Sequence, residues 1–309
     1  MNYHPTIRQL TYLLALEKIR NFSRAAERCH VTQSTLSASI QDLEANLGMP
    51  LVERGRRFMG LTRAGMEVAA RGRQILALAD DIVSYAASRK SPLSGELRLG
   101  AIPTIGPFLL PRAVSSLGAA YPELKLLLRE AQTLELLTLL SGGELDAVLM
   151  AFPYAVSGLN VKILGNDPLR LLVPAADPFA KRNHIRAEEL IGKELLLLED
   201  GHCLRDHALE VCQMQGISRS ADYEGTSLLT LALMVEMGRG YTLVPDLAIK
   251  SGLIRGLEVR AVPIGCEDEG REIGLVWRKS SPREEEFNSL ANGIKKALLG
   301  QTESMARAS

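Results

Sequence analysis

A pair of short helices joined by a tight turn is predicted by residues 23–37, Ser23-Arg24-Ala25-Ala26-Glu27-Arg28-Cys29-His30-Val31-Thr32-Gln33-Ser34-Thr35-Leu36-Ser37. Serine is a favourable N-cap, so Ser23 is expected to begin the first helix. His30 and Val31 are expected to make the turn, and Thr32 to cap the second helix. Two helices in this order, separated by so short a turn, are typical of a helix-turn-helix.

The second helix of this pair has an apolar side and a polar side. Leucine or isoleucine recurs at positions 36, 40, 43 and 47, a spacing of three and four residues that predicts a buried stripe. Polar side chains gather at the N-terminal end of the opposite face, the part of such a helix that reaches base edges in the major groove. The residues predicted to bind DNA there are Thr32, Gln33, Ser34, Thr35 and Ser37.

Residues 51–61 are expected to form a two-stranded ribbon whose glycine turn is flanked by arginines. On such a wing, Arg54, Arg56 and Arg57 would contact phosphates or enter the minor groove. The alternative is a solvated basic hairpin. Because the ribbon follows a helix-turn-helix, we favour the wing and assign residues 1–61 to one DNA-binding domain.

Thr62 is expected to cap a long helix that reaches about Ser88 and carries an apolar stripe on one side. No other segment of the sequence offers a matching stripe of that length, so residues 62–90 are expected to pair with a second copy of the chain. Burial in the core of the next domain is the alternative. Residues 91–95, Ser91-Pro92-Leu93-Ser94-Gly95, are predicted to be a hinge.

From residue 96 onward strands alternate with helices, which predicts a doubly wound α/β fold with a parallel sheet. Ligands of such sheets lie at the carboxyl ends of strands, here at residues 103–106, at residues 132–133 and after residue 198. We assign this region to a regulatory domain, residues 96–301, with one lobe at about 96–163 and 270–301, a second lobe at about 164–269, and a tail at 302–309.

The chain has 309 residues, 46% of them hydrophobic, and exceeds what one hydrophobic core usually accommodates, so two or more domains are expected. The net charge of zero hides an uneven distribution: residues 1–90 hold thirteen Lys and Arg against eight Asp and Glu, and the remainder is acidic to the same extent. A basic module joined to an acidic one fits a DNA-binding protein. No signal peptide or membrane-spanning run is recognisable, so a cytoplasmic, nucleoid-associated protein is expected.

Cys203 and Cys212 lie nine residues apart in a polar, ionisable segment. A thiol reacts as its thiolate, and His202, Arg205 and His207 are cationic or hydrogen-bonding groups that would favour the thiolate of Cys203. In one continuous helix the two Cα atoms would stand ~13 Å apart, whereas a disulfide needs less than about 7 Å. Bond formation would then require local unfolding, as in a redox switch. Two unrelated buried cysteines explain the spacing equally well.

The other two cysteines of the four are predicted to be bystanders, because Cys29 falls on the apolar side of a helix and Cys266 in a turn. No Cys and His spacing fits a zinc site, and the sequence contains no glycine-rich phosphate loop. No metal and no cofactor are therefore expected.

In their order, these parts resemble the LysR-type transcriptional regulators over essentially the whole chain. The resemblance implies an N-terminal all-α winged helix-turn-helix with a long linker helix, and a C-terminal α/β two-lobed effector domain like that of periplasmic binding proteins. The residues that carry it are Ala25-Ala26-Glu27, His30-Val31-Thr32-Gln33-Ser34, Leu36-Ser37, Leu43-Glu44, Leu47-Gly48, Leu51 and Glu53-Arg54.

Four further segments resemble the branch of that family that responds to hydrogen peroxide: residues 102–107, 130–133, 198–206 with Cys212, and 271–276. This resemblance implies that Cys203 is the peroxide-reactive thiol and Cys212 the resolving thiol. It also implies a polar pocket around the reactive sulfur, made by Thr104, Thr133, His202, Asp206 and Arg271. His207 stands where the branch has a glutamine, a difference that bears on the acidity of the pocket and not on the mechanism.

The resemblance further implies the partners of the protein. These are double-stranded promoter DNA, hydrogen peroxide, RNA polymerase, and a thiol reductant such as a glutaredoxin that restores the thiols. A dimer of dimers is implied, while the long helix alone argues for a dimer. The protein is expected to be a regulator and not an enzyme.

Two other functions are compatible with the sequence. The first is a LysR-type regulator that responds to a small organic anion in the cleft between its lobes, which would not need Cys203 for its response. The second is a thiol peroxidase that its DNA-binding domain merely localises. Such an enzyme would turn over with a cellular reductant at catalytic rates, whereas a sensor reacts about once per signal.

Overall fold

The computed structural model describes residues 3–53, 60–88, 93–212, 218–225, 227–265 and 270–306. It forms two compact units. The first consists of Met1–Arg89 with residues 141–144 and 280–282, and the second contains the remainder. Among the helices in these described ranges, none combines the length and the apolar character needed to cross a membrane.

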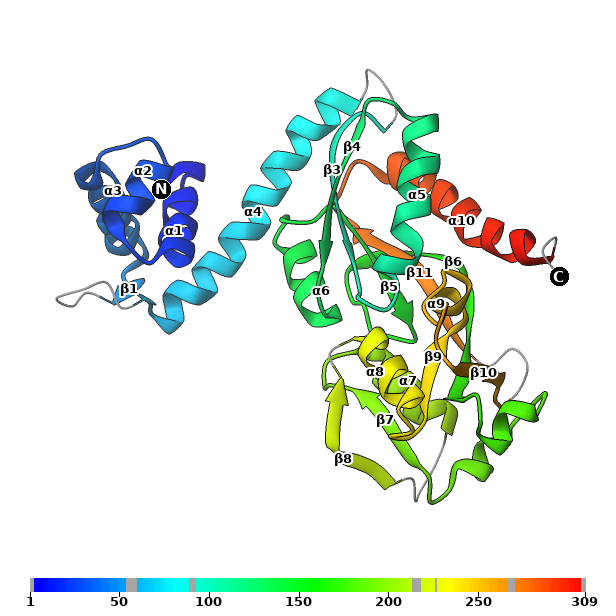
Figure 1. Cartoon of the computed structure of the whole chain (residues 1–309). Helices are drawn as coiled ribbons and strands as arrows, with labels where there is room; N and C mark the ends of the chain where they lie inside the picture. The colour runs from blue at the N-terminus through cyan, green and yellow to red at the C-terminus, as the bar shows by residue number, and fades with distance from the viewer. Residues whose placement is uncertain are drawn as a thin grey trace. The chain divides into compact units, whose positions relative to one another are not determined.

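The first unit is mainly helical (Figure 1). Its described elements are α1 (Ile7–Ile19), α2 (Phe22–Arg28), α3 (Gln33–Leu47), β1 (Val52–Glu53), β2 (Gly60–Leu61) and α4 (Arg63–Ser88).

The turn between α2 and α3 is fixed by local hydrogen bonds. Thr32 caps α3 as predicted, because its hydroxyl accepts a hydrogen bond from the backbone N–H of Thr35 at 3.2 Å. The prediction that Ser23 caps α2 is wrong. Asn21 is the cap, with extended backbone and a side-chain oxygen that accepts from the N–H of Arg24 at 3.0 Å. Asparagine and serine both favour caps, so residue type alone did not fix which of them begins the helix.

Helix α3 buries the predicted apolar stripe. Leu36, Ile40 and Leu43 are buried against residues of α1, and Leu47 is half-buried. Beyond the helix, Glu44 directs the chain into β1, because one carboxylate oxygen accepts from the N–H groups of both Leu51 (2.8 Å) and Val52 (3.0 Å). This holds the end of α3 and the start of the ribbon as one body.

Strands β1 and β2 pair in antiparallel fashion, with Val52 opposite Leu61. The arginines predicted to line a wing, Arg54, Arg56 and Arg57, fall between these strands and outside the described residues. The helix predicted after Thr62 is present as α4, and the Thr62 hydroxyl accepts from the N–H of Gly65 at 2.9 Å. Several apolar side chains of α4 are exposed: Met66, Ile75, Leu78, Ile82 and Val83.

The second unit is an α/β structure. Its first half comprises β3 (Gly95–Ala101), α5 (Gly106–Ala120), β4 (Leu124–Glu130), α6 (Thr133–Ser141), β5 (Ala147–Phe152) and the long strand β6 (Leu159–Pro174). The chain continues through the 3-10 helices η1 (Pro178–Lys181) and η2 (Ala187–Leu190), then β7 (Glu194–Leu198), α7 (Cys203–Cys212), β8 (Ser218–Gly225), α8 (Leu228–Glu236), β9 (Thr242–Pro245), α9 (Asp246–Lys250), β10 (Val259–Pro263), β11 (Gly270–Arg278) and α10 (Glu284–Ala306).

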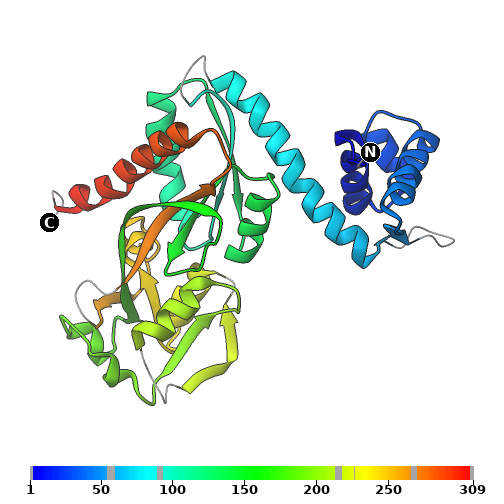
Figure 2. The ribbon, with the colours of Figure 1, turned by 180° about the vertical axis from the view of Figure 1, so that it is seen from behind.

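The main sheet is mixed, so the expectation of a parallel sheet is wrong for its central strands. Its order is β10-β6-β11-β5-β3-β4, with β9 also pairing with β6. Strand β3 runs parallel to β4 and β5, whereas β11 is antiparallel to both β5 and β6. The departure arises because the chain returns through β11 beside β6, as Figure 2 shows from behind. A second, two-stranded parallel sheet contains β7 and β8, with α7 and α8 beside it in Figure 1.

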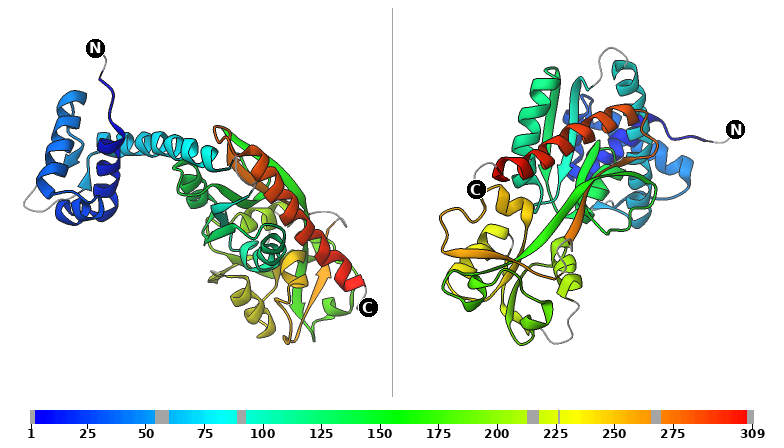
Figure 3. Two further views of the ribbon diagram at one scale, coloured as in Figure 1. Left: turned by 90° about the horizontal axis from the view of Figure 1, so that it is seen from above. Right: turned by 90° about the vertical axis from the view of Figure 1, so that its right-hand side faces the viewer.

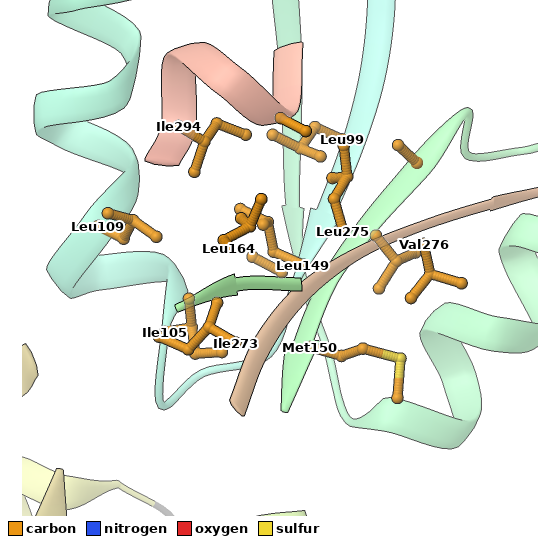
Figure 4. Packing of buried hydrophobic residues seen from close by; sticks show 14 of the residues in the cluster. Leu99, Ile105, Leu109, Leu149, Met150, Leu164, Ile273, Leu275, Val276 and Ile294 are labelled. Carbon is orange, nitrogen blue, oxygen red and sulfur yellow. The ribbon is translucent and has the colours of Figure 1, made fainter. Parts of the chain in front are cut away.

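Two separate hydrophobic cores lie in the second unit. The first fills the space between the strands around β5 and the helices α5 and α10, with Leu99, Leu149 and Leu275 among its buried residues (Figure 4). Helix α10 runs along α5 and β6 (Figure 3). The second core gathers around β7, α8 and the distal half of β6. Strand β6 serves both, since Leu164 belongs to the first core and Leu171 to the second.

Candidate functional site

Cys203 is the first residue of α7 and follows strand β7 by a short loop. It is a free cysteine, buried to 6% exposure. The N-terminal turn of a helix carries unpaired N–H groups and a partial positive charge, which favour an anion such as a thiolate. Cys203 therefore lies at the N-terminal end of a helix, directly after the loop that leaves β7.

A small pocket opens beside Cys203 and holds about 160 Å³ of empty space. Three segments meet in it: the turn after β3, the start of α6, and the loop that enters α7. These are the segments expected from the carboxyl ends of the strands. The lining residues are Ile102, Pro103, Thr104, Gln132, Thr133, Gly201, His202 and Cys203.

The hydroxyl of Thr133 is the most unusual polar group in this pocket. It is buried, and within the described part of the chain its oxygen has no hydrogen-bond partner. A buried polar atom without a partner costs free energy, so such atoms in native proteins call for an explanation. A small polar ligand in the pocket would supply the missing bond.

Arg271 lies behind the pocket lining and is fully buried, at 0% exposure. Its Nη1 donates to Thr104 Oγ1 at 2.6 Å and its Nη2 donates to the Thr104 carbonyl at 2.9 Å. Its Nε and Nη2 donate to Asp167 Oδ2 at 3.1 and 3.0 Å. Arg271 thus reaches the pocket through Thr104, and is not itself a lining residue.

Asp167 is a site residue that the sequence did not reveal. It lies on β6, and its second oxygen, Oδ1, accepts from the backbone N–H of Leu247 in α9 at 2.8 Å. Burial raises the pKa of the Asp167 carboxyl, and the guanidinium of Arg271 opposes that shift. The signal that could have found it is that Asp167 is the single carboxylate in the sequence of β6, Leu159–Pro174.

The ionisable residues around Cys203 take different positions. His202 is buried and lines the pocket, with Nε2 3.7 Å from the Glu199 carboxylate. Arg205 donates to the carbonyl of Leu198 at 3.0 Å and pairs with Asp200 at 3.2 Å. Its guanidinium therefore binds the end of β7 and the loop before α7.

Two further residues predicted near the thiol lie elsewhere. The Nε2 of buried His207 lies 3.3 Å from the carbonyl oxygen of Pro153. Asp206 is exposed and absent from the lining, because its position on the first turn of α7 faces solvent. Of the predicted pocket residues, the structure brings Thr104, Thr133 and His202 together around Cys203.

Gln132 is a second residue that was not predicted as a site residue by itself. Its side-chain nitrogen donates to the carbonyl of Asp200 at 3.3 Å and lies 3.5 Å from the Glu199 carboxylate. The neighbouring Gly201 has φ +93°, a conformation that favours glycine. Gln132 therefore connects the start of α6 to the loop that carries Cys203.

Helix α7 is continuous from Cys203 to Cys212, which places the two Cα atoms ~13 Å apart. Cys29 is half-buried at the C-cap of α2, and burial raises the pKa of its thiol while Arg28 opposes the shift. Cys266 is outside the described residues. Among the described residues, no group of three or more His, Cys, Asp and Glu side chains could hold a metal ion.

The polar residues predicted to bind DNA lie at the start of α3. Thr32, Gln33, Ser34 and Thr35 are exposed, and Ser37 is half-buried. The Thr32 hydroxyl bonds to those of Ser34 (2.9 Å) and Thr35 (2.7 Å), so these three side chains form a small hydroxyl network around the cap. Gln33 stands beside this network on the first turn of the helix.

Family models and known proteins match both units. The model described as bacterial regulatory helix-turn-helix protein, lysR family, matches residues 7–66, and the model of the LysR substrate binding domain matches residues 90–298. The DNA-binding transcriptional dual regulator OxyR of Escherichia coli K12 is 39% identical over 294 residues, covering 95% of this chain and 96% of that protein. The hydrogen peroxide-inducible genes activator of Dickeya chrysanthemi is 38% identical over 292 residues, covering 94% of this chain and 95% of that protein.

Two solved structures resemble the chain over nearly its whole length. A full-length OxyR cysteine-to-aspartate variant from Pseudomonas aeruginosa superposes with a TM-score of 0.78 at 34% identity, covering 94% of this chain and 98% of that one. A cysteine-to-serine variant of OxyR from Corynebacterium glutamicum with hydrogen peroxide bound superposes with a TM-score of 0.68 at 32% identity, covering 100% of this chain and 97% of that one.

Proposed function

The chain belongs to the LysR family of bacterial helix-turn-helix regulators, and we propose that it changes transcription when hydrogen peroxide oxidises Cys203 and joins it to Cys212 in a disulfide. It is a peroxide-sensing regulator like the OxyR proteins that it resembles. One observation supports the proposed chemistry: the buried thiol at the N-terminus of α7 lines a small pocket together with Thr133. The Thr133 hydroxyl has no hydrogen-bond partner among the described residues.

The first chemical step is attack of the Cys203 thiolate on one oxygen of hydrogen peroxide. A sulfur–oxygen bond forms, the oxygen–oxygen bond breaks, and hydroxide leaves, so the sulfur becomes a sulfenic acid. Negative charge builds on the departing oxygen and is stabilised by hydrogen-bond donors in the pocket. We propose that Thr133 and Thr104, which line the pocket with His202, donate these hydrogen bonds.

The second step requires α7 to unwind. The thiolate of Cys212 attacks the sulfenic sulfur, a sulfur–sulfur bond forms, and the hydroxyl group leaves with a proton as water. A disulfide needs Cα atoms closer than about 7 Å, and the continuous helix holds them ~13 Å apart. Oxidation therefore converts a change in one sulfur atom into a change in backbone structure, which is what a redox switch needs.

The pocket favours peroxide over the alternative of an organic anion. The pocket is a narrow recess and lacks the roughly 300–1,000 Å³ of space that ordinary small-molecule sites offer. An anion-responsive regulator would also leave the buried thiol without a role. A DNA-tethered peroxidase is the other alternative, and we propose a regulator and not an enzyme because every curated relative named above is a transcriptional regulator or activator.

On the DNA side, we propose that the start of α3 reads bases through Gln33 and its hydroxyl neighbours, within a winged helix-turn-helix of residues 1–61. Arg54, Arg56 and Arg57 would contact phosphates. Residues 62–90 would be a linker helix, and the exposed apolar residues of α4 would pair with a second copy. The same proposal includes a hinge at residues 91–95 and a two-lobed effector domain like that of binding proteins. It also includes a dimer of dimers on the nucleoid, contact with RNA polymerase, and reduction by a glutaredoxin-like thiol.

The test is mass spectrometry of the reduced protein after brief exposure to one equivalent of peroxide. A peptide pair linked through Cys203 and Cys212 is expected from the wild type and from Cys29→Ser, and not from Cys203→Ser. A wild type that retains both thiols, or a transcriptional response to peroxide that survives in Cys203→Ser, would contradict the proposed function.

A further inference from the structure

The carboxylate of Asp167 is buried between the two cores of the second unit, and hydrogen bonds occupy both of its oxygens. Its side chain is 1% exposed. Oδ2 accepts two hydrogen bonds from Arg271, and Oδ1 accepts the backbone N–H of Leu247 at the start of α9. Helix α9 has no side-chain cap from its own N-cap residue, so Asp167 fills that place from β6. The carboxylate thus fixes Arg271 to the frame of the unit.

Arg271 uses its other edge to hold Thr104. A guanidinium only donates hydrogen bonds, so Thr104 Oγ1 must be the acceptor in its 2.6 Å bond with Arg271 Nη1. The hydroxyl proton of Thr104 must then point elsewhere, and no acceptor in the described part of the protein bonds to it. Thr104 lines the Cys203 pocket.

We propose that Asp167 is a positioning residue for the peroxide reaction. Asp167 fixes the plane of the Arg271 guanidinium, so that Arg271 keeps donating a hydrogen bond to the Thr104 hydroxyl oxygen. The Thr104 hydroxyl proton is then directed into the pocket. The inference rests on the proposed function and names a residue that acts through two others, without touching peroxide or sulfur.

A hydrogen bond donated by Thr104 is expected to speed the reaction of Cys203 with peroxide more than its other reactions. When the Cys203 thiolate forms its bond to one oxygen, the other leaves as hydroxide, and a donated hydrogen bond from Thr104 stabilises that charge. No proton needs to be transferred from Thr104, so the sulfenic acid and hydroxide balance the step. A reaction at the same sulfur without an oxygen leaving group, such as alkylation, would draw much less on this hydrogen bond.

The experiment compares these two reactions in the full-length protein. Second-order rate constants are measured by stopped flow for Cys203 with hydrogen peroxide and with iodoacetamide, in wild type and in Asp167→Asn. The peroxide rate constant is expected to fall at least about tenfold, because one donor aimed at a developing charge contributes that much or more. The alkylation rate constant is expected to change by less than about threefold, since only the peroxide step has an oxygen leaving group.

A double-mutant cycle tests the route through Thr104. Once Thr104→Val has removed the hydroxyl, adding Asp167→Asn should slow the peroxide reaction little further, because the two residues act through one bond. Asp146→Asn is the matched control. Asp146 is a buried carboxylate just before β5 that pairs with Arg98 at 2.9 Å. Neither residue lines the pocket, so the loss of Asp146 should leave the ratio of the two rate constants unchanged.

Arg271→Lys provides a second variant should Asp167→Asn not fold. Lysine keeps the charge but cannot bond to Asp167 and Thr104 with a fixed fork, so the same selective loss of at least about tenfold is expected. An unchanged peroxide rate constant, equal losses in both reactions, or additivity with Thr104→Val would overturn the role of Asp167. Slow oxidation of wild-type Cys203, no faster than free cysteine, would instead overturn the proposed function itself.

Discussion

The side-chain oxygen of Gln132 lies so close to Gly201 that a β-carbon at position 201 would clash with it. The two residues come from different segments, the start of α6 and the loop before α7, and Gln132 also donates to the carbonyl of Asp200. The Gln132 side chain therefore connects the start of α6 to the loop before Cys203. It fits there because residue 201 is a glycine and has no β-carbon.

Gly201→Ala should displace Gln132 and break its bond to Asp200. The substitution also forces alanine into a positive φ, and Gly192→Ala controls for that strain, since Gly192 has φ +74° with no neighbour within 4 Å. We expect Gly201→Ala to lower the free energy of unfolding by about 0.5–1.5 kcal/mol more than Gly192→Ala, the net contribution of one hydrogen bond. Urea unfolding measures both. Equal losses would show that the Gln132 contact does not stabilise the loop.

Thr133→Val should stabilise the protein and slow its oxidation. Its hydroxyl oxygen has no partner within the described residues, so an isosteric apolar side chain is expected to raise the free energy of unfolding by about 1 kcal/mol. The rate constant of Cys203 with peroxide should fall about tenfold or more. Thr242→Val is the matched control.

The Thr242 hydroxyl is also buried, but it donates to the carbonyl of Leu196 at 2.8 Å. Its replacement by valine should lower the free energy of unfolding by about 1–3 kcal/mol, because the carbonyl loses its bond, and leave oxidation unchanged. Thermal unfolding and stopped flow give both quantities. A stability loss at Thr133 as large as that at Thr242 would mean that the Thr133 hydroxyl is satisfied in solution.

Cys212→Ser should stop oxidation at the sulfenic acid. The first step needs only Cys203, so a sulfenic acid-specific probe should label the variant after peroxide, whereas wild type should be labelled only transiently. The oxidised variant should retain the helical circular dichroism of the reduced protein, because no disulfide draws α7 apart. Rapid formation of a disulfide in Cys212→Ser would identify a different resolving thiol.

Tyr241 should resist ionisation at alkaline pH. Burial, and then its 2.7 Å hydrogen bond to Asp177, raise the pKa of the phenol to about 12. The folded state thus prefers the neutral phenol. The resulting stability is present below pH ~10, the unfolded pKa, and is lost as pH rises toward 12. A spectrophotometric titration of wild type against Tyr241→Phe measures this group, and a difference spectrum with a midpoint near 10 would contradict the assignment.

Gln33→Ala should weaken binding to the cognate operator by ~1–3 kcal/mol and spare binding to random duplex, as expected for a side chain that reads a base edge. Gln41→Ala is the matched control, because Gln41 is exposed on the same helix but lies two turns from its N-terminus. Salt titrations on both duplexes separate the two effects. Equal losses on operator and random DNA would exclude sequence reading by Gln33.

The sequence predicted the elements whose signals are local. Thr32 caps its helix because a threonine before a polar first turn is a short-range signal. Strands β8 and β10 were missed. Ser218–Gly225 is mostly polar and shows no alternation, so it has no periodic signal of a strand.

Contacts between residues far apart in the sequence could not be predicted from local sequence signals. Strand β6 runs from Leu159 to Pro174 with Pro168 inside it, opposite Gly270, although proline is a local signal against a strand interior. Asp167 is bonded to an arginine 104 residues later in the chain, and no spacing rule connects two positions so far apart. Cys203 and Thr104 were predicted as site residues from their motifs, whereas the hydrogen bonds that connect Arg271 to Thr104 could be seen only in the fold.

The continuous strand β6 has a thermodynamic consequence for the second unit. Leu164 and Leu171 are seven residues apart on one strand and belong to different cores, so neither core can melt without disturbing the strand that supports the other. Heat is expected to unfold both in one cooperative transition. A substitution deep in the distal core, such as Leu171→Ala, would then lower the amount of folded sensor in a cell and raise the peroxide dose needed for a response, while each surviving molecule kept its normal reactivity.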